Sequence, residues 1–167
     1  GINYGLFSVA NVIENTHKIL PKMPIIGTET GSCTTTRGEF ITDKQTNQVL
    51  KSYDEEKVSW GATVAEQWDF CRKNDYYSGI FVWTGFDYRG EPTPFKWPSV
   101  SSQFGILDTC GFEKSAFHFF KACFTDSPML KLIPHWNWKK GDTVRVVAIT
   151  NCEEEELSIN GKSHGVK

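Results

Sequence analysis

Short apolar runs alternate with amphipathic stretches along the first 125 residues of the chain. Residues 24–29 and 79–83 are apolar runs of the kind that forms parallel strands buried on both faces. Residues 1–4 have the character of a strand end. The segments 6–17 and 57–73 carry apolar residues at three- and four-residue steps. This spacing predicts an amphipathic helix between each pair of strands.

The order strand–helix–strand brings two polar strand ends together. Parallel strands joined by a right-handed crossover end at the same edge of a sheet, so Glu29 and the segment 83–87 are expected at one rim. In an α/β barrel this rim carries the active site. An acid beside the indole of Trp83 suits a sugar, because C–H faces pack on aromatic rings and hydroxyls bond to carboxylates. Taken alone, the strand is equally consistent with a structural ion pair of Glu29.

Two long loops and a short helix follow these strands. Residues 31–54 are polar and rich in Thr, Gln and Asn. Residues 89–102 contain three prolines and three serines together with two aromatic residues. Loops of this length after barrel strands commonly carry function. Residues 115–124 predict a short aromatic helix. Together these segments make about three strand–helix units of a barrel that needs eight, so we expect a fragment of a larger protein.

The pattern changes near residue 127. Residues 129–134 and 143–150 alternate between apolar and polar positions, and residues 156–159 form one more short strand. The pair Asn160-Gly161 that follows is a strong hairpin signal. These strands are the expected opening of an antiparallel immunoglobulin-like β-sandwich, which needs about seven strands.

Composition and charge exclude several function classes. The 167 residues have a net charge of −2, which gives no basic footprint for nucleic acid. The apolar runs are too short to cross a bilayer. The five cysteines contain no C-x-x-C pair and the four histidines are far apart, so we expect scattered, mostly buried thiols and no metal site. No signal peptide is visible, which leaves the compartment open.

Six segments are similar to the β-galactosidases of glycoside hydrolase family 2. They are Pro-Ile-Ile-Gly-Thr-Glu-Thr-Gly-Ser, Thr-Arg-Gly-Glu, the run from Gly79 to Pro94, the run from Trp97 to Asp108, Pro-His-Trp-Asn-Trp and Asn-Gly-Lys-Ser-x-Gly. The resemblance covers nearly the whole chain. It implies the C-terminal part of a (β/α)8 TIM barrel in residues 1–126 and the start of an immunoglobulin-like β-sandwich in residues 127–167.

The resemblance implies a role for three residues near the strand ends. The family hydrolyses β-glycosides with retention through two glutamates, and Glu29 matches its nucleophile. Tyr4 matches a tyrosine that bonds this nucleophile, and Trp83 matches a tryptophan that walls the sugar subsite. The segment that carries the acid/base would precede residue 1, so we expect this fragment alone to be inactive. The family histidine after the nucleophile is absent, since residues 30–33 read Thr-Gly-Ser-Cys.

Further residues are candidates for contacts with the substrate. Tyr88 lies beside the proposed sugar wall, and Trp97 is either a subsite lid or part of a rigid proline-rich loop. Trp83 itself could also be a core residue. For the substrate, the family implies a β-galactoside oligosaccharide or glycoconjugate; other β-glycosidases of the family, such as β-glucuronidases and β-mannosidases, are the alternatives. The family also implies a periplasmic or secreted location. Some of its members bind a metal ion near the site, but the residues after Phe104 offer no obvious oxygen ligand, so we expect no metal and no cofactor here.

Two charged residues have open interpretations. Arg37 is a candidate second charge partner of the nucleophile, with a salt bridge to Glu39 or Asp43 as the alternative. Asp87 either accepts hydrogen bonds from substrate hydroxyls or pins the loop that follows it. Two functions of other classes also remain open. One is a non-catalytic sugar-binding protein on a degenerate barrel, and the other is an interaction module that uses only the sandwich tail. Beyond the substrate, we expect the remainder of the parent chain as a partner, and neither nucleic acid nor a membrane.

Overall fold

The computed structural model of the chain describes residues 1–5 and 11–166. The chain divides into two compact units, Gly1–Phe117 and His118–Lys167, and each is described by itself. The helix α3, Ser115–Phe124, contains the point of division and has the bounds that the sequence predicts. Within the described ranges, no helix has both the length and the apolar character needed to cross a membrane.

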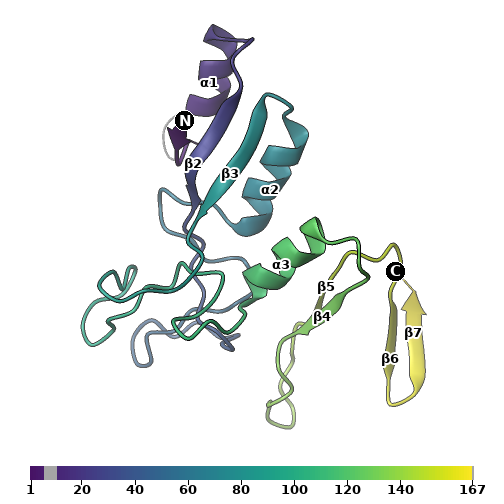
Figure 1. Cartoon of the computed structure of the whole chain (residues 1–167). Helices are drawn as coiled ribbons and strands as arrows, with labels where there is room; N and C mark the ends of the chain where they lie inside the picture. Colours follow the sequence, from purple (N-terminus) through teal and green to yellow (C-terminus); the bar gives the residue numbers. More distant parts are fainter. Residues whose placement is uncertain (6–10, 167) are drawn as a thin grey trace. The chain divides into compact units, whose positions relative to one another are not determined.

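A three-stranded parallel sheet forms the centre of the first unit (Figure 1). Its strands are β1 (Ile2–Asn3), β2 (Ile25–Gly31) and β3 (Tyr77–Trp83), in the spatial order β1-β2-β3. Both pairs are parallel, so the predicted parallel arrangement of the two apolar runs is confirmed. The register places Gly31 beside Trp83, which aligns the carboxyl ends of β2 and β3.

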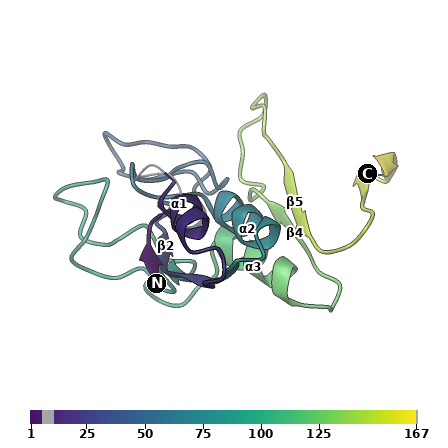
Figure 2. The same ribbon diagram turned by 90° about the horizontal axis from the view of Figure 1, so that it is seen from above.

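The core of this unit lies between the sheet and two helices. Helix α1 (Val12–Ile19) and helix α2 (Val64–Lys73) run beside β2 and β3 in Figure 1, and Figure 2 shows the two helices from above. Ile13 of α1 joins Ile25 and Tyr77 in a buried cluster, against which Phe70 of α2 also packs. Part of the first predicted helix, residues 6–10, lies outside the described residues.

Only one face of the sheet is covered within the described part of this chain. Along β2, buried and exposed residues alternate, and Ile26 is exposed. On β3, Phe81 is 64% exposed. The expectation of strands buried on both faces is therefore wrong for the described residues, because both helices contribute to the same core cluster.

Helix α2 begins later than its apolar spacing predicts. The hydroxyl of Thr63 accepts a hydrogen bond from the Glu66 amide (3.2 Å), and the Glu66 carboxylate accepts one from the Thr63 amide (2.7 Å). This capping box fixes the start of the helix at Val64. The carboxylate of Asp54 accepts two more hydrogen bonds from the first turn, from the amides of Val64 (2.8 Å) and Ala65 (2.9 Å). Trp60 thus lies before the helix, and the prediction of a helix over 57–73 is wrong for its first turns.

The segment 31–54 is compact and anchored, although it contains little regular structure. Leu50 has no exposed surface, and buried Ser52 donates to the carbonyl of Thr36 (2.7 Å). The hydroxyl of Thr36 donates to the side chain of Gln103 (2.7 Å). These bonds join the loop after β2 to the segment that follows β3, so the two predicted loops support each other.

The second unit contains two antiparallel strand pairs. Strand β4 (Leu130–Ile133) pairs with β5 (Val147–Thr150), and β6 (Glu156–Ile159) pairs with β7 (Lys162–Val166). Asn160 and Gly161 have φ angles of 51° and 78°, as a two-residue type I′ turn requires, and the predicted hairpin is confirmed. Strand β5 is shorter than the predicted run 143–150.

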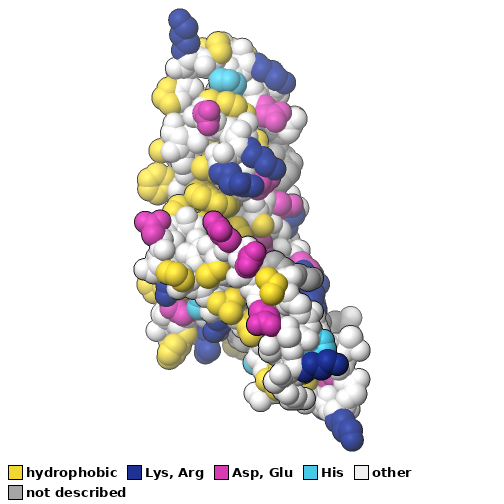
Figure 3. Space-filling view, turned by 90° about the vertical axis from the view of Figure 1, so that its right-hand side faces the viewer, with side chains coloured by type: hydrophobic (Ala, Val, Ile, Leu, Met, Phe, Trp, Pro, Cys, Tyr) yellow, Lys and Arg dark blue, Asp and Glu magenta, His cyan; other side chains and the backbone are white. Residues whose placement is uncertain are grey.

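The surface of the protein carries charges of both signs. Figure 3 shows Lys and Arg side chains interspersed with Asp and Glu on the face that it presents, together with scattered apolar side chains. All five cysteines are free thiols. Of these only Cys33 is buried, so the expectation of mostly buried cysteines is wrong.

Candidate active site at the strand ends

The carboxyl ends of the three parallel strands bring the main predicted site residues together. The amide of Tyr4 donates to the carbonyl of Glu29 (2.8 Å), which joins β1 to β2. The amide of Ser32 donates to the carbonyl of Trp83 (3.1 Å), which joins β2 to β3. The backbone therefore fixes Tyr4, Glu29 and Trp83 at one edge of the sheet, as the strand order predicts.

Tyr4 and Glu29 are in contact through their side chains. The phenol of Tyr4 lies 2.9 Å from the hydroxyl of Ser32 and within hydrogen-bonding reach of the carboxylate of Glu29. Burial and the charge of Glu29, against the opposing effect of the bond with Ser32, raise the pKa of Tyr4 to about 12. Tyr4 is therefore a neutral hydrogen-bond donor at neutral pH.

Trp83 and Tyr88 form the second side of the cluster. The indole N–H of Trp83 donates to the Tyr88 hydroxyl (3.1 Å), and the two rings pack edge to face with centroids 5.7 Å apart. The Tyr88 hydroxyl donates in turn to the carboxylate of Glu91. Burial raises the pKa of Tyr88 to about 12, with further contributions from Glu91 and from Glu29. Tyr88 thus lies within electrostatic reach of Glu29.

Tyr88 is positioned by Ser102, a residue with no exposed surface. The hydroxyl of Ser102 accepts from the Tyr88 amide (3.0 Å), and the amide of Ser102 donates to the Tyr88 carbonyl (2.7 Å). Two backbone groups of Tyr88 are thereby held by one residue of the next segment. The peptide bond between Trp83 and Thr84, at the start of this connection, is cis.

Asp87 is engaged by protein groups. Its carboxylate accepts from the Lys114 ammonium (2.8 Å) and from the Gly105 amide (2.8 Å). The side chains of Asp87 and Lys114 are 8% and 0% exposed. Burial raises the pKa of Asp87 and lowers that of Lys114, and the ion pair opposes both shifts. Of the two interpretations of Asp87, these contacts support the anchoring of the following loop.

Among the described residues, Arg37 and Trp97 make no hydrogen bond, ion pair or ring contact with the cluster of Tyr4, Glu29 and Trp83. The guanidinium of Arg37 pairs with Asp108 at 2.5 Å and lies over the ring of Phe112. The expected alternative partners, Glu39 and Asp43, were therefore wrong. Trp97 lies on the loop after β3 and is 83% exposed. Its role as a subsite residue stays a prediction.

Several residues that hold the site in place could not be identified from the sequence. Ser32, Glu91, Ser102 and Lys114 each contact a predicted site residue. A serine or a lone lysine in a polar segment resembles an ordinary surface residue. A sequence-level signal exists only for Ser32, because it follows Gly31 directly after the strand. In the structure this serine adopts a positive φ of 60°.

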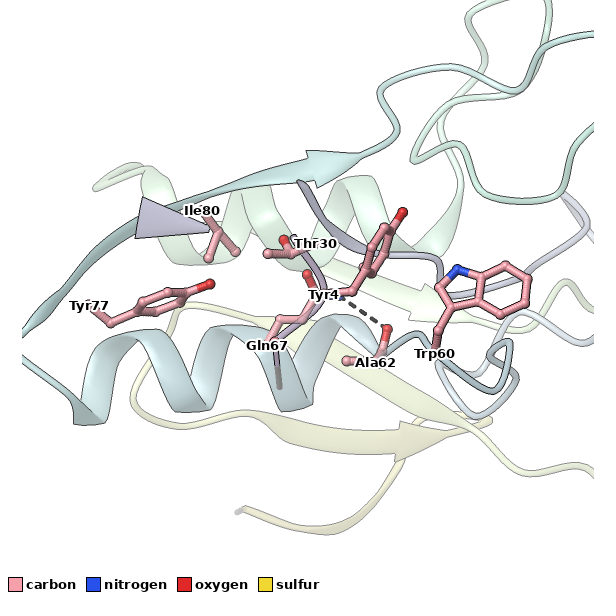
Figure 4. A pocket seen from close by; sticks show the side chains of 9 residues that line it. Tyr4, Thr30, Trp60, Ala62, Gln67, Tyr77 and Ile80 are labelled. Carbon is pink, nitrogen blue, oxygen red and sulfur yellow. Dashed lines mark hydrogen bonds between the residues drawn. The ribbon is translucent and has the colours of Figure 1, made fainter. Parts of the chain in front are cut away.

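A small pocket lies next to Tyr4, between the sheet and helix α2 (Figure 4). It is too small to admit a sugar ring. Its buried Gln67 donates to the carbonyls of Ala62 (3.1 Å) and Thr63 (3.0 Å). Gln67 thereby holds the start of helix α2 beside the strand ends. Across the described ranges, no group of three or more His, Cys, Asp or Glu side chains could hold a metal ion.

The chain is similar to known proteins in both sequence and fold. The chain is 40% identical, over its whole length, to the β-galactosidase BoGH2A of Bacteroides ovatus, and it spans 21% of that relative. It is 28% identical over 59% of its length to a β-glucuronidase of Formosa agariphila, of which it spans 10%. No profile of a known protein family matches the chain.

Solved structures give the same result for the fold. A β-glycosidase from Bacteroides vulgatus matches 93% of the chain with a TM-score of 0.80 and 29% identity, and the chain spans 24% of it. A β-glucuronidase from glycoside hydrolase family 2 matches 88% of the chain with a TM-score of 0.66 and 24% identity, and the chain spans 16% of it. The chain therefore spans between 10% and 24% of the length of these relatives.

Proposed function

The resemblance to glycoside hydrolase family 2 is confirmed over the whole chain, and from it we propose that these residues belong to a retaining β-glycosidase. The observation that carries the proposal is the contact of the Tyr4 phenol with the Glu29 carboxylate at the ends of adjacent parallel strands. A neutral phenol that donates a hydrogen bond to a nucleophilic carboxylate orients it for attack.

The proposed reaction needs two carboxyl groups about 5–5.5 Å apart. Glu29 attacks the anomeric carbon and forms a covalent glycosyl-enzyme, while an acid protonates the leaving oxygen. Water then hydrolyses the intermediate with the same acid acting as base. Glu91 is bonded to Tyr88, so we place the acid/base on a part of the protein outside this chain.

We further propose that residues 1–126 form the C-terminal part of a (β/α)8 barrel and residues 127–167 the start of an immunoglobulin-like sandwich. The parallel sheet with its site at the strand ends supports the first assignment. The antiparallel pairs β4–β5 and β6–β7 support the second. In this arrangement Trp83 would wall the sugar, with its indole plane held by Tyr88.

An uncharged sugar, and in particular a β-galactoside, is the substrate that the charges favour. The cluster of Tyr4, Glu29, Trp83, Tyr88 and Glu91 contains two carboxylates and no cation. Of the cations in this unit, Arg37 and Lys114 are each paired with an aspartate. A glucuronide brings its own carboxylate, which the two carboxylates of this cluster would repel. The 40% identity to a β-galactosidase supports the same choice.

Covalent labelling of the full-length protein tests this proposal. A 2-deoxy-2-fluoro-β-galactoside with a good leaving group should inactivate the enzyme and add one glycosyl group to the peptide that contains Glu29. Glu29→Gln should abolish labelling and turnover, whereas Glu14→Gln on α1 serves as the matched control and should change neither. Label on another residue would refute the assignment of the nucleophile. Faster inactivation by the corresponding fluoroglucuronide would refute the choice of sugar.

A further inference from the structure

Ser32 makes a bond that the proposed catalytic roles do not yet explain. Its hydroxyl lies 2.9 Å from the Tyr4 phenol oxygen, and Ser32 as a whole is only 1% exposed. Either oxygen of this pair could be the donor by distance alone. The direction matters, because a phenol has one proton to donate.

The third partner decides the direction of the bond. An ionised carboxylate can only accept hydrogen bonds, so in the contact between Tyr4 and Glu29 the phenol must be the donor. The single proton of Tyr4 is then committed to Glu29. The bond between Tyr4 and Ser32 must therefore run from the serine hydroxyl to the phenol oxygen. The resulting order of donation is Ser32 to Tyr4 to Glu29.

The backbone holds Ser32 in this position. Its amide donates to the Trp83 carbonyl (3.1 Å), and its carbonyl accepts from the Val58 amide (3.4 Å). Its φ of 60° lies in the left-handed region, which non-glycine residues rarely adopt. The residue is thus fixed between β3 and the loop 31–54, and its side chain has a defined direction.

We infer that Ser32 is a positioning residue that directs the phenolic proton of Tyr4 to the nucleophile Glu29. The inference rests on the proposed function. A phenol that accepts a hydrogen bond at its oxygen becomes a better donor, since bonds in a chain polarise one another. Ser32 therefore strengthens the bond that Tyr4 donates to Glu29 without touching the carboxylate, and it prevents the phenol from donating elsewhere.

Removal of the hydroxyl in the full-length enzyme tests this role. Ser32→Ala and Ser32→Gly both lose the donor, but glycine tolerates the positive φ and alanine does not, so a change common to both comes from the hydroxyl. We expect kcat/KM for an aryl β-galactoside to fall about 2- to 10-fold, the range of one neutral hydrogen bond. The acid limb of its pH profile should move to higher pH, because Glu29 loses stabilisation of its charged form.

A double-mutant cycle separates positioning from a merely structural role. In the Tyr4→Phe background, Ser32→Ala should have no further effect on the acid limb, because Ser32 acts through Tyr4. Ser52→Ala is the matched control. This serine is also 1% exposed, and its hydroxyl donates to a carbonyl in the loop 31–54, so the pH profile should not move. An unmoved acid limb in both Ser32 variants, or equal losses in both backgrounds, would overturn the inference. In either case labelling at Glu29 would leave the proposed function intact, whereas full turnover by Glu29→Gln would remove the function itself.

Discussion

Neutralising Lys114 should destabilise the protein more than the loss of any surface ion pair. Lys114→Met keeps an unbranched apolar side chain of similar length and removes the charge. The change leaves the carboxylate of Asp87 8% exposed and without its cation. Only the Gly105 amide at 2.8 Å and the more distant Ser102 hydroxyl at 3.4 Å would remain as its partners.

The expected cost follows from the burial of the pair. Breaking a buried ion pair by removing one partner costs about 3–5 kcal/mol, because an uncompensated charge stays buried. Replacing both partners by neutral residues is much less costly. The double variant Asp87→Asn with Lys114→Met should therefore be more stable than Lys114→Met alone. The coupling between the two changes should reach about 2–3 kcal/mol, the upper range for residues in contact.

Urea titration of the full-length protein, monitored by tryptophan fluorescence, measures these costs. The variants are compared with the same slope of the unfolding free energy against urea concentration. The matched control is Lys73→Met on α2, which breaks an ion pair with Asp69 of 2.6 Å whose side chains are 62% and 46% exposed. The control should change the free energy of unfolding by no more than about 0.5 kcal/mol. Equal costs for Lys114→Met and Lys73→Met, or additive costs for the two changes at Lys114 and Asp87, would refute the reasoning from burial.

Three further predictions test the site and its support. Burial raises the pKa of Tyr4 and of Tyr88 to about 12, so the folded state keeps protons that an unfolded tyrosine loses near pH 10. The free energy of unfolding should therefore fall between pH 10 and 12, and it should fall less steeply in Tyr4→Phe. Thermal unfolding measured across this pH range tests both expectations. A slope equal in both proteins would contradict the burial of Tyr4. Trp83→Ala should raise KM for an aryl β-galactoside about 2- to 10-fold through the lost ring contact, with Trp136→Ala in the second unit as the control that leaves KM unchanged. Thr63→Ala should cost about 1 kcal/mol of stability through the lost cap of α2, and Thr63→Ser should restore it; equal loss in both variants would show that the hydroxyl is not the cap.

The elements with a local signal could be predicted from the sequence. The aromatic helix Ser115–Phe124 and the hairpin at Asn160-Gly161 follow from side-chain spacing and from a turn that needs two positive φ angles. The start of α2 could not be predicted from spacing, because Trp60 and Val64 fit one helical face while the bonds of Thr63 and Asp54 decide where the helix begins. A capping residue competes with periodicity at every helix end, and here the cap prevails.

The site shows the same division between strand ends and side-chain partners. Glu29 and Trp83 could be placed together because parallel strands end at one edge, and this needs only the pattern of the two runs. The partners of Arg37 and Asp87 could not be predicted, since Asp108 and Lys114 lie 71 and 27 positions away along the chain. Ser32 belongs to both classes: its position follows from the strand end, but its role follows only from the number of protons that Tyr4 can donate. The chemistry of this edge therefore depends on a serine that no motif distinguishes, and the pH profile of Ser32→Ala is the measurement in which that dependence becomes visible.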